Sequence, residues 1–427
     1  MGYRPINITS RAPQKTVEDF WMPAIVQYPT VVQQALDRFG DHFQNEPERR
    51  HFAEYLTGLL IARKKNVSAI NREFAFTTDQ SCLNRFVTDV DWDAESLNAD
   101  RLEWLQQDQK TRYSQSGIIA IDNVLIDHSG KHIEDVGYFW DHAESRSKIA
   151  HDYLIANYVC NSGKQYPLEF YRFVKKDECQ KKETQFQDHN VLFRNLVDWA
   201  VANEIPGDFT FDSWFTHKDN LNHINSKGRN YVGDLKFNRK ILFQGQDIKA
   251  EELARTIDPD VRKLIIVGEH RQYYFTKSVR IPGVDHKVRI LILWKKKNDI
   301  NPKKILVCNR CHWEAIRMLK VYRCRWQGTE CFHRDGKQYL GMGDCQLRSG
   351  LGQTRHMYMV FLAYSVLMSQ MQQNRVCEWA CERLTTIGQS CMAVLRETFS
   401  NTISWVVDQI ESEGLSFERI KIQLALP

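Results

Sequence analysis

The chain has 427 residues, 42% of them hydrophobic and 11% aromatic, which is the composition of an ordinary globular protein. This length exceeds what one compact core usually holds, so we expect two or three domains. No apolar run reaches the ~18 residues needed to span a bilayer, and the amino terminus lacks the apolar core of a signal peptide. We therefore expect a cytoplasmic protein with no membrane partner, whose eleven cysteines are reduced thiols.

The net charge of +5 is only mildly basic, but the positive residues are grouped. One such group is more often a solvated surface than a binding site, whereas several in one chain favour contact with phosphates. The groups are Arg63-Lys64-Lys65, Lys175-Lys176, Lys181-Lys182, Lys295-Lys296-Lys297 and Lys303-Lys304. Cys308 and Cys311 have the spacing of a zinc knuckle, but no second pair with matched spacing follows, so we do not expect zinc.

The amino-terminal region, residues 1–115, is predicted to be helical. Residues 1–20 are polar and read as an unstructured arm. A helix with one apolar stripe follows, then a short helix over Val67–Phe74, and then a third helix that Asp79 can cap. Three short helices beside Arg63, Lys64 and Lys65 fit a helix-turn-helix that reads a major groove, and they fit a plain helical bundle equally well. We interpret the region as a DNA-binding domain.

Strand patterns begin at residue 116. Apolar runs predict strands over Ile118–Ile121, Val136–Trp140, His151–Cys160 and Tyr166–Val174, with short turns between them. An amphipathic helix around residues 191–200 comes next, then the strand-like phrase FTFDSWF, another helix, and the strand-like phrase YVGDLKFNR. This succession contains three strands followed by a helix, a strand and a helix, which is the order of an RNase H-like α/β core, so residues 116–240 are assigned to its first part.

The rest of the chain divides into three further regions. Residues 241–304 contain β-branched runs broken by glycine and proline and are predicted to be a β-rich insertion. Residues 305–355 return to the core with one short strand and a helix. Residues 356–427 are helical, with an interruption at Gly388, and we expect them to take part in dimerisation. The predicted fold class is thus α/β, an RNase H-like core with an insertion, flanked by helical terminal domains.

The stretch Tyr322–Gln346 places several cations and aromatic residues around one acid, Glu330. Residues three or four apart share a helix face, and Glu330, Arg334 and Lys337 have that spacing. One carboxylate surrounded by cations is unsuited to a hydrophobic core. It is suited to holding a metal ion against a polyanion.

Two further acids, Asp122 and Asp212, each follow an apolar strand. A buried carboxylate there is costly unless it is paired or binds a metal, and ligands gather at the strand ends of α/β sheets. Taken singly, each acid is more often a cap or a surface charge. Together with Glu330 they form an oxygen-ligand set that suits two Mg²⁺ ions and phosphoryl transfer.

On these residues the chain resembles the DDE transposases of bacterial insertion sequences, in the branch with a YREK signature. Tyr322, Arg325, Glu330 and Lys337 match that signature, and the second acid lies in the phrase FDSWF, which also fits. The resemblance covers about residues 50–365. It implies an enzyme that cuts the inverted-repeat ends of its element and joins the 3′-ends to target DNA.

The resemblance also implies roles for individual residues. Asp122, Asp212 and Glu330 would be catalytic and would bind two Mg²⁺ ions, for which Mn²⁺ can substitute. Double-stranded DNA would be the partner, a homodimer would hold two ends, and the protein would associate with the nucleoid. The residues expected to contact DNA are Tyr322, Arg325, Lys337, Arg334, Lys236, Arg63, Lys64, Lys65 and, by stacking on a flipped base, Trp294.

Two positions depart from the family pattern. Four residues separate Arg325 from Glu330 where three are usual, which on an ideal helix rotates the acid by about 100°. Either a helix bulge restores the shared face, or Tyr322 and Arg325 are displaced. Val124 replaces a threonine near the first acid. A metal-dependent nuclease without strand transfer, and a decayed transposase that only binds DNA, therefore remain as alternatives.

Overall fold

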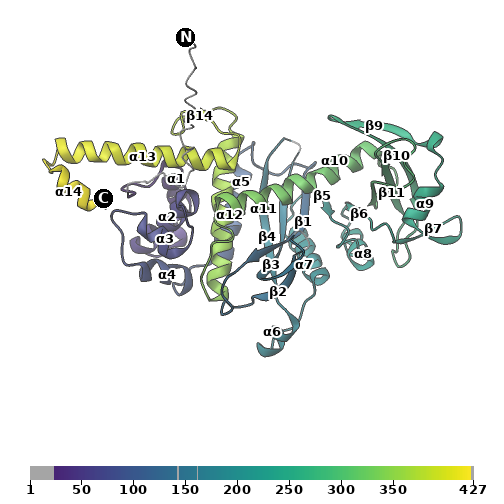
Figure 1. Ribbon diagram of the computed structural model, residues 1–427, viewed down its shortest axis with the longest axis horizontal. Coiled ribbons are helices and arrows are strands. Elements are labelled where there is room, and N and C mark those ends of the chain that lie inside the picture. The colour runs from purple at the N-terminus through teal and green to yellow at the C-terminus, as the bar shows by residue number, and fades with distance from the viewer. Residues whose placement is uncertain (1–23, 142–143, 161, 425–427) are drawn as a thin grey trace, which may run out of the picture.

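The computed structural model describes residues 24–141, 144–160 and 162–424, so the arm expected at residues 1–20 lies outside the described residues. A twisted sheet of mixed strand direction forms the centre, with helical regions of both ends of the chain gathered on one side and the insertion on the other (Figure 1). This is the mixed α/β architecture expected for an RNase H-like core. Within these residues, every helix is too short or too polar to cross a membrane.

The amino-terminal region is helical, as its stripe pattern predicts. Four helices begin with a side-chain cap that accepts a hydrogen bond from a backbone N–H group of the first turn, which would otherwise have no partner within the helix. The capping residues are Asn45, Asn66, Asp79 and Asp93. The elements are α1 (Thr30–Phe39), η2 (Gly40–His42), α2 (Glu46–Ile61), α3 (Val67–Arg72), α4 (Gln80–Thr88) and α5 (Ala94–Gln107). Their apolar faces belong to the same hydrophobic core as the sheet, so this region is not a separate lobe.

The central sheet carries the strand order of an RNase H-like core. Strands β4, β3, β1, β5 and β6 lie side by side in that order, with β3 antiparallel to β1 and with β1, β5 and β6 parallel to one another. The strands are β1 (Ile118–Asp127), β2 (Gly137–Asp141), β3 (Arg146–Val159), β4 (Gln165–Phe173), β5 (Asp208–Phe211) and β6 (Tyr231–Asp234). The helices between them are α6 (Lys176–Lys181), α7 (His189–Ala202) and α8 (Lys218–Ser226).

The insertion extends the same sheet. After a small hairpin, β7 (Lys240–Phe243) and β8 (Gln246–Lys249), come α9 (Ala250–Thr256) and η3 (Pro259–Val261). Strands β9 (Lys263–Val267), β10 (His270–Val279) and β11 (Val288–Trp294) then pair in series, and β11 pairs with β12 (Lys304–Cys308) beside β6. The predicted β-rich character is present, and the three longest of its strands continue the core sheet.

Two predicted boundaries are wrong. The first strand does not end at Asp122 but runs on to Asp127, because its partner β3 is fourteen residues long and pairs along the whole of it. Gly388 does not interrupt the last helices; it lies in the first turn of α13 (Ile387–Glu411), where a Cβ would be 2.6 Å from the Tyr339 ring. The actual break is a short hairpin, β13 (Val376–Cys377) and β14 (Glu382–Arg383).

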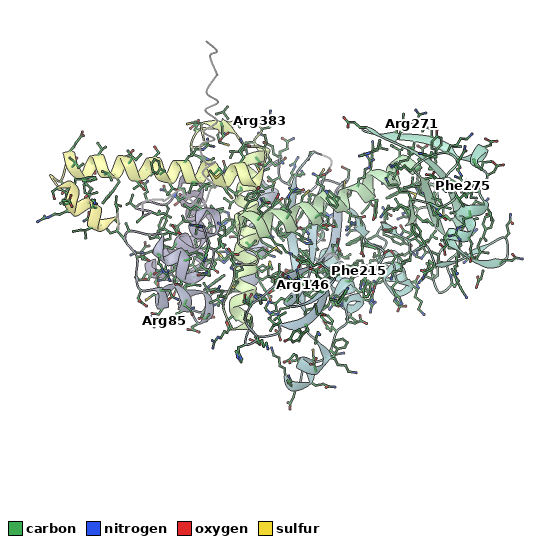
Figure 2. The ribbon with its side chains drawn as sticks, in the orientation of Figure 1. Arg85, Arg146, Phe215, Arg271, Phe275 and Arg383 are labelled. Carbon is green, nitrogen blue, oxygen red and sulfur yellow. The ribbon has the colours of Figure 1, made fainter. Side chains whose placement is uncertain are left out.

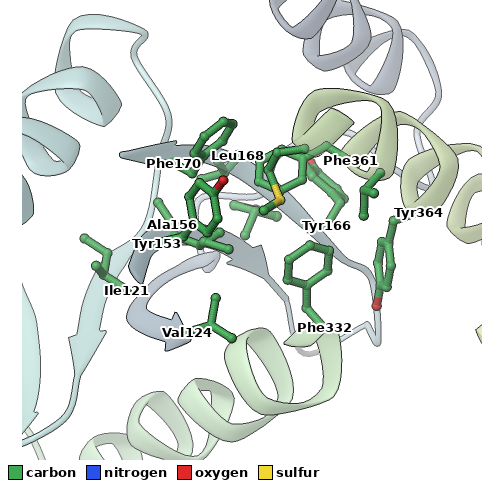
Figure 3. Packing of buried hydrophobic residues seen from close by; sticks show 14 of the residues in the cluster. Ile121, Val124, Tyr153, Ala156, Tyr166, Leu168, Phe170, Phe332, Phe361 and Tyr364 are labelled. Atoms are coloured by element: carbon green, nitrogen blue, oxygen red, sulfur yellow. The ribbon is translucent and has the colours of Figure 1, made fainter. Parts of the chain in front are cut away.

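Helices of the carboxyl-terminal half pack against both the sheet and the amino-terminal helices. They are α10 (Ala315–Trp326), the π-helical η4 (Gln327–Cys331), α11 (Phe332–Tyr339), α12 (Gly350–Gln372), α13 and α14 (Phe417–Gln423). Phe332 meets Phe361 and Tyr364 of α12 edge-on, with ring centroids 5.6 and 5.0 Å apart (Figure 3). This contact fixes the π-helical segment, which immediately precedes Phe332, relative to the core.

A buried polar cluster joins α5, β4 and α12. Arg101 is fully buried and donates to Ser365 Oγ at 2.7 Å, while Tyr358 donates to Glu169 at 2.7 Å. Asn98 donates to the carbonyl of Leu168 at 3.0 Å. Burial raises the pKa of Glu169 to about 7. Burial therefore favours the protonated form of Glu169, and ionising this side chain inside the core is costly.

The pH dependence of stability should show this cost. Because the pKa of Glu169 is higher in the folded chain than in the unfolded one, its contribution is fully present below about pH 4.5 and is lost as the pH rises through about 7. The loss is up to about 3 kcal/mol, since one pKa unit corresponds to ~1.4 kcal/mol. Urea unfolding at pH 5 and pH 8 measures it. In Glu169→Gln the difference between the two pH values should shrink; an unchanged difference would assign it to other groups.

Candidate active site

Two of the predicted acids lie next to each other on neighbouring strands. Ile121 of β1 is opposite Phe211 of β5 in the parallel register, so Asp122 and Asp212 are each the next residue along. Neighbouring strands are ~4.8 Å apart, which brings residues from distant parts of the sequence together. Asp212 Oδ1 also accepts a hydrogen bond from the Trp214 backbone N–H at 2.9 Å, which holds the turn after β5. The first two acids of the prediction therefore share one edge of the sheet.

The third acid, Glu330, lies in the π-helical segment η4. A π-helix adds one residue to a helical turn, so it absorbs the extra residue between Arg325 and Glu330. Arg325 Nη1 is 2.5 Å from Asp122 Oδ2 and 3.8 Å from Glu330 Oε1. The helix irregularity predicted from the sequence is thus present, and it brings Arg325 and Glu330 to the side of the helix that faces Asp122.

Gly328 explains how this segment can approach the sheet. A Cβ at this position would be 2.3 Å from Val159 Cγ2 of β3 and 3.0 Å from Ala120 Cβ of β1. Only a residue without a side chain leaves room for the π-helix to lie directly on the two strands. Thr329, the next residue, is fully buried and places its Oγ1 3.4 Å from Asp122 Oδ2.

Adding one methyl group here should therefore be costly. We expect Gly328→Ala to lower the free energy of unfolding by about 1–3 kcal/mol, the usual cost of overpacking a tight core, and to displace Glu330. Gly343→Ala is the matched control, because a Cβ at Gly343 meets nothing within 4 Å. Urea denaturation of both variants measures the difference. Equal stability of the two variants would show that η4 is free to move away from the sheet.

The charges of the site are strongly coupled. Asp122 is only 8% exposed, and burial raises its pKa to about 7; the negative charges of Asp212 and Glu330 add to the rise and Arg325 opposes it. Burial also raises the pKa of Asp212. Three carboxylates with one arginine leave an excess of negative charge, and a cation would relieve it.

The donor chemistry fits a divalent metal ion, although the present arrangement does not close around one. Across the described residues, no three carboxylate, imidazole or thiol groups are close enough to share an ion. The Arg325 guanidinium lies between two of the acids, 2.5 Å from Asp122 Oδ2 and 3.8 Å from Glu330 Oε1. Carboxylate oxygens are the ligands that Mg²⁺ and Mn²⁺ prefer, so the three acids fit such an ion in their donor chemistry.

Three residues near the acids were not predicted from the sequence to belong to the site, namely Asp234, Lys304 and Thr329. Asp234 ends β6, the parallel neighbour of β5, and its charge contributes to the raised pKa of Asp212. Lys304 Nζ is 2.8 Å from Asp234 Oδ2 and 3.0 Å from the Tyr322 hydroxyl. Asp234 could have been predicted as a site residue, because it is an acid at the end of a short predicted strand. No sequence signal pointed to Thr329, whose position depends on the π-helix.

The residues predicted to contact DNA are in varied surroundings. Arg334 is exposed beside Asp335, and the exposed Lys337 donates to the carbonyl of Leu125 at 2.8 Å. The ammonium of Lys236 lies 5.1 Å from the centre of the Trp214 ring, and Arg63 and Lys64 are exposed at the end of α2. These positions remain compatible with phosphate contact.

Two of those predictions are wrong. Lys65 is buried, and its ammonium donates to the carbonyl of Ala62 at 2.8 Å, so it closes the carboxyl end of α2 and does not face DNA. Trp294 is 0% exposed in β11, with the Arg262 guanidinium 4.0 Å from its ring centre. A side chain enclosed in this way cannot stack on a base, and Trp294 is a core residue.

The fold is that of an RNase H-like protein, and Asp122 and Asp212 lie side by side at one edge of its sheet. Comparison with family models supports this class. The model described as DDE superfamily endonuclease matches residues 38–257, and the model described as Transposase DDE domain matches residues 187–366. The first match covers just over half of the chain, and the chain belongs to the DDE superfamily of endonucleases. No curated protein matches it.

Proposed function

We propose that this chain is a DNA transposase of the YREK branch, which cuts the inverted-repeat ends of an insertion sequence and joins the 3′-ends to target DNA. The observation that carries the proposal is the alignment of Asp122 and Asp212 on adjacent parallel strands, with Glu330 reached through Arg325. Asp122 and Asp212 come from distant parts of the chain to one strand edge, where α/β proteins bind ligands, and Arg325 lies between Asp122 and Glu330. The family match to transposase domains agrees with this chemistry.

In the proposed reaction, Asp122, Asp212 and Glu330 would hold two Mg²⁺ ions. When bound, such ions supply an activated water or 3′-hydroxyl and stabilise the leaving oxygen. The protein's own contribution is positioning: the β1–β5 register fixes the two aspartates, and the contact of Gly328 with the sheet fixes the segment that carries Glu330. Arg325 would release Asp122 and contact a phosphate of the DNA end, which keeps its charge compensated.

Contact with DNA is proposed along the same face and at the amino-terminal helices. Lys337, Arg334 and Tyr322 would touch phosphates near the cut. In the helical region, residues 51–60 of α2 are buried, whereas α4 exposes Ser81 and Arg85. Figure 2 shows Arg85 at the outer side of this region. We therefore assign reading of the inverted repeat to α4, with Lys64 on the backbone beside it.

A homodimer is part of the proposal. Helix α13 extends away from the body of the molecule (Figure 1) and exposes large apolar residues at helical spacing. Exposed apolar stripes of this kind are typical of protein interfaces. The residues are Met392, Phe399, Ile403, Val407 and Ile410.

One assay separates this function from the alternatives. The full chain is incubated with Mg²⁺, a labelled duplex that carries the inverted repeat bracketing its gene, and an unlabelled plasmid. Labelled ends joined to the plasmid identify a transposase, and cut ends without joining identify a nuclease. A shifted band on a native gel without any cutting identifies a protein that only binds DNA, and this result would contradict the proposal.

A further inference from the structure

Asp234 lies in one row with the two aspartates of the candidate site. Phe211 of β5 is opposite Gly233 of β6 in the parallel register, so Asp212 and Asp234 are each the next residue along. Asp122 has the corresponding place on the other side of Asp212. Residues of one row share a face of the sheet, here the face on which α10 packs. The sheet therefore presents a further acid beside the proposed catalytic ones.

The two outer acids of this row each hold a cation. Arg325 contacts Asp122, and at the other end the Lys304 ammonium is 2.8 Å from Asp234 Oδ2. Lys304 begins β12, the antiparallel neighbour of β6, which brings its side chain to the end of β6. Among the described residues, Asp212 forms no ion pair, and it lies between these two pairs. Positive charge thus flanks the acid that the proposed function places at the cut.

Lys304 is held in place, unlike its neighbour in the sequence. Its ammonium also donates to the Tyr322 hydroxyl at 3.0 Å and lies 4.9 Å from the centre of the Tyr322 ring. Burial lowers the pKa of Lys304, but the hydrogen bonds to Asp234 and Tyr322 raise it by more, so the ammonium stays charged. Lys303, by contrast, is exposed and forms no ion pair with any described residue. A fixed cation at this edge of the sheet is therefore a property of Lys304 and not of the basic run.

The cluster of Asp234, Lys304 and Tyr322 keeps one hydrogen-bond donor free. Tyr322 has a single O–H, and it donates to Asp234 Oδ2 at 3.4 Å. An ammonium has three N–H donors, and within the described residues Lys304 has two acceptors, Asp234 and Tyr322. The Lys304 side chain is 34% exposed, so a ligand from solvent can reach the third N–H. Because the O–H of Tyr322 is already used, the donor available to a phosphate at this place belongs to Lys304.

We propose that Lys304 binds a phosphate of the DNA strand that passes Asp212, and that Asp234 is the positioning residue that directs the ammonium to it. The phosphate oxygen accepts the third N–H, while Asp234 and the Tyr322 hydroxyl keep the other two. The inference rests on the proposed function and deepens it, because it names the donor that contacts the DNA beside Tyr322.

A double-substitution cycle between Lys304 and single phosphates tests the contact. The probes are the inverted-repeat duplex and copies of it in which one phosphate near the end of the repeat is a neutral methylphosphonate. With the full chain and no divalent metal, we expect Lys304→Met to weaken binding of the unmodified duplex about tenfold, the size of one charge-assisted hydrogen bond. The slope of log affinity against log salt should fall by about one. One methylphosphonate should cost the unsubstituted chain a similar factor and cost Lys304→Met nothing further.

Matched variants separate contact with DNA from stability. Lys303→Met removes an exposed charge next door and should still show the full loss at that methylphosphonate. Lys304→Gln keeps a polar partner for Asp234 and should behave as Lys304→Met, which guards against misfolding; urea unfolding checks each variant. Asp234→Asn removes a negative charge near the DNA and should bind the unmodified duplex at least as tightly. Its loss at that methylphosphonate should fall to about threefold, because the ammonium is no longer directed to the phosphate.

Two results would overturn the proposal. In the first, no methylphosphonate position couples to Lys304, and the lysine is then only a structural partner of Asp234. In the second, Tyr322→Phe loses about tenfold in affinity while Lys304→Met loses none, which assigns the phosphate to the tyrosine hydroxyl. Failure of the proposed function would be seen separately, as absence of metal-dependent cutting by the unsubstituted chain.

Discussion

Replacing Asp212 by asparagine should abolish metal-dependent DNA cutting while leaving DNA binding and folding intact. The substitution keeps the shape of the side chain but removes the charge that a divalent ion requires. We expect the cutting rate to fall by about 10³-fold or more, because charge stabilisation by a metal is worth several kcal/mol and ~1.4 kcal/mol is a factor of ten in rate. Single-turnover cutting of a labelled inverted-repeat duplex measures this rate.

The control for Asp212→Asn is another acid of the same sheet. Asp127 ends β1, is half exposed, and shares Lys148 with Asp141 and Glu144. Asp127→Asn should therefore cut at a rate close to that of the unsubstituted chain. If Asp212→Asn cuts as fast as Asp127→Asn, the carboxylate of Asp212 has no part in the reaction, and the assigned site is wrong.

Removing Arg325 should produce a protein that depends on metal for its stability. The guanidinium is the cation that Asp122 contacts, and removal of one partner of a buried ion pair leaves the other charge without compensation. We expect Arg325→Ala to be less stable by about 3 kcal/mol without metal. Saturating Mn²⁺ should restore about as much, since a ligand at 100 times its Kd stabilises by ~2.7 kcal/mol.

The same variant should bind Mn²⁺ more tightly, because the ion no longer has to displace the guanidinium. Titration calorimetry without DNA measures the affinity, and we expect an increase of about tenfold, or ~1.4 kcal/mol. Arg317→Ala on the same helix is the control, since Arg317 is exposed and lies against Trp313. A weaker affinity in Arg325→Ala than in Arg317→Ala would mean that Arg325 supports the metal site and does not compete with the ion for it.

The neighbouring positions of the two candidate aspartates could be predicted because their signals are local. Asp122 and Asp212 each follow an apolar run, and a parallel sheet brings such positions to one edge. The extra residue before Glu330 could also be interpreted, since helix geometry allows few ways to absorb it and the structure uses a π-helix. The order of strands and helices then predicted the central sheet.

The remaining errors concern burial, which neighbouring residues in the sequence do not determine. Lys65 is part of a basic run, yet tertiary packing turns it inward to the end of α2. Trp294 is enclosed because β11 lies between β10 and β12 in the extended sheet and the Arg262 guanidinium covers its ring. Trp214, by contrast, follows the apolar phrase FTF and is exposed. The sequence shows which residues are aromatic or charged, but only the packed chain shows which of them a ligand can reach.

The central claim is that Asp122, Asp212 and Glu330 share metal ions although Arg325 now stands between two of them. A crystal structure of the full chain with inverted-repeat DNA and Mn²⁺, using the anomalous scattering of manganese, tests it most directly. We expect manganese peaks about 2.1 Å from oxygens of all three carboxylates, with Arg325 moved from Asp122 to a phosphate. Manganese bound elsewhere, or Glu330 directed away from both aspartates with DNA in place, would contradict it.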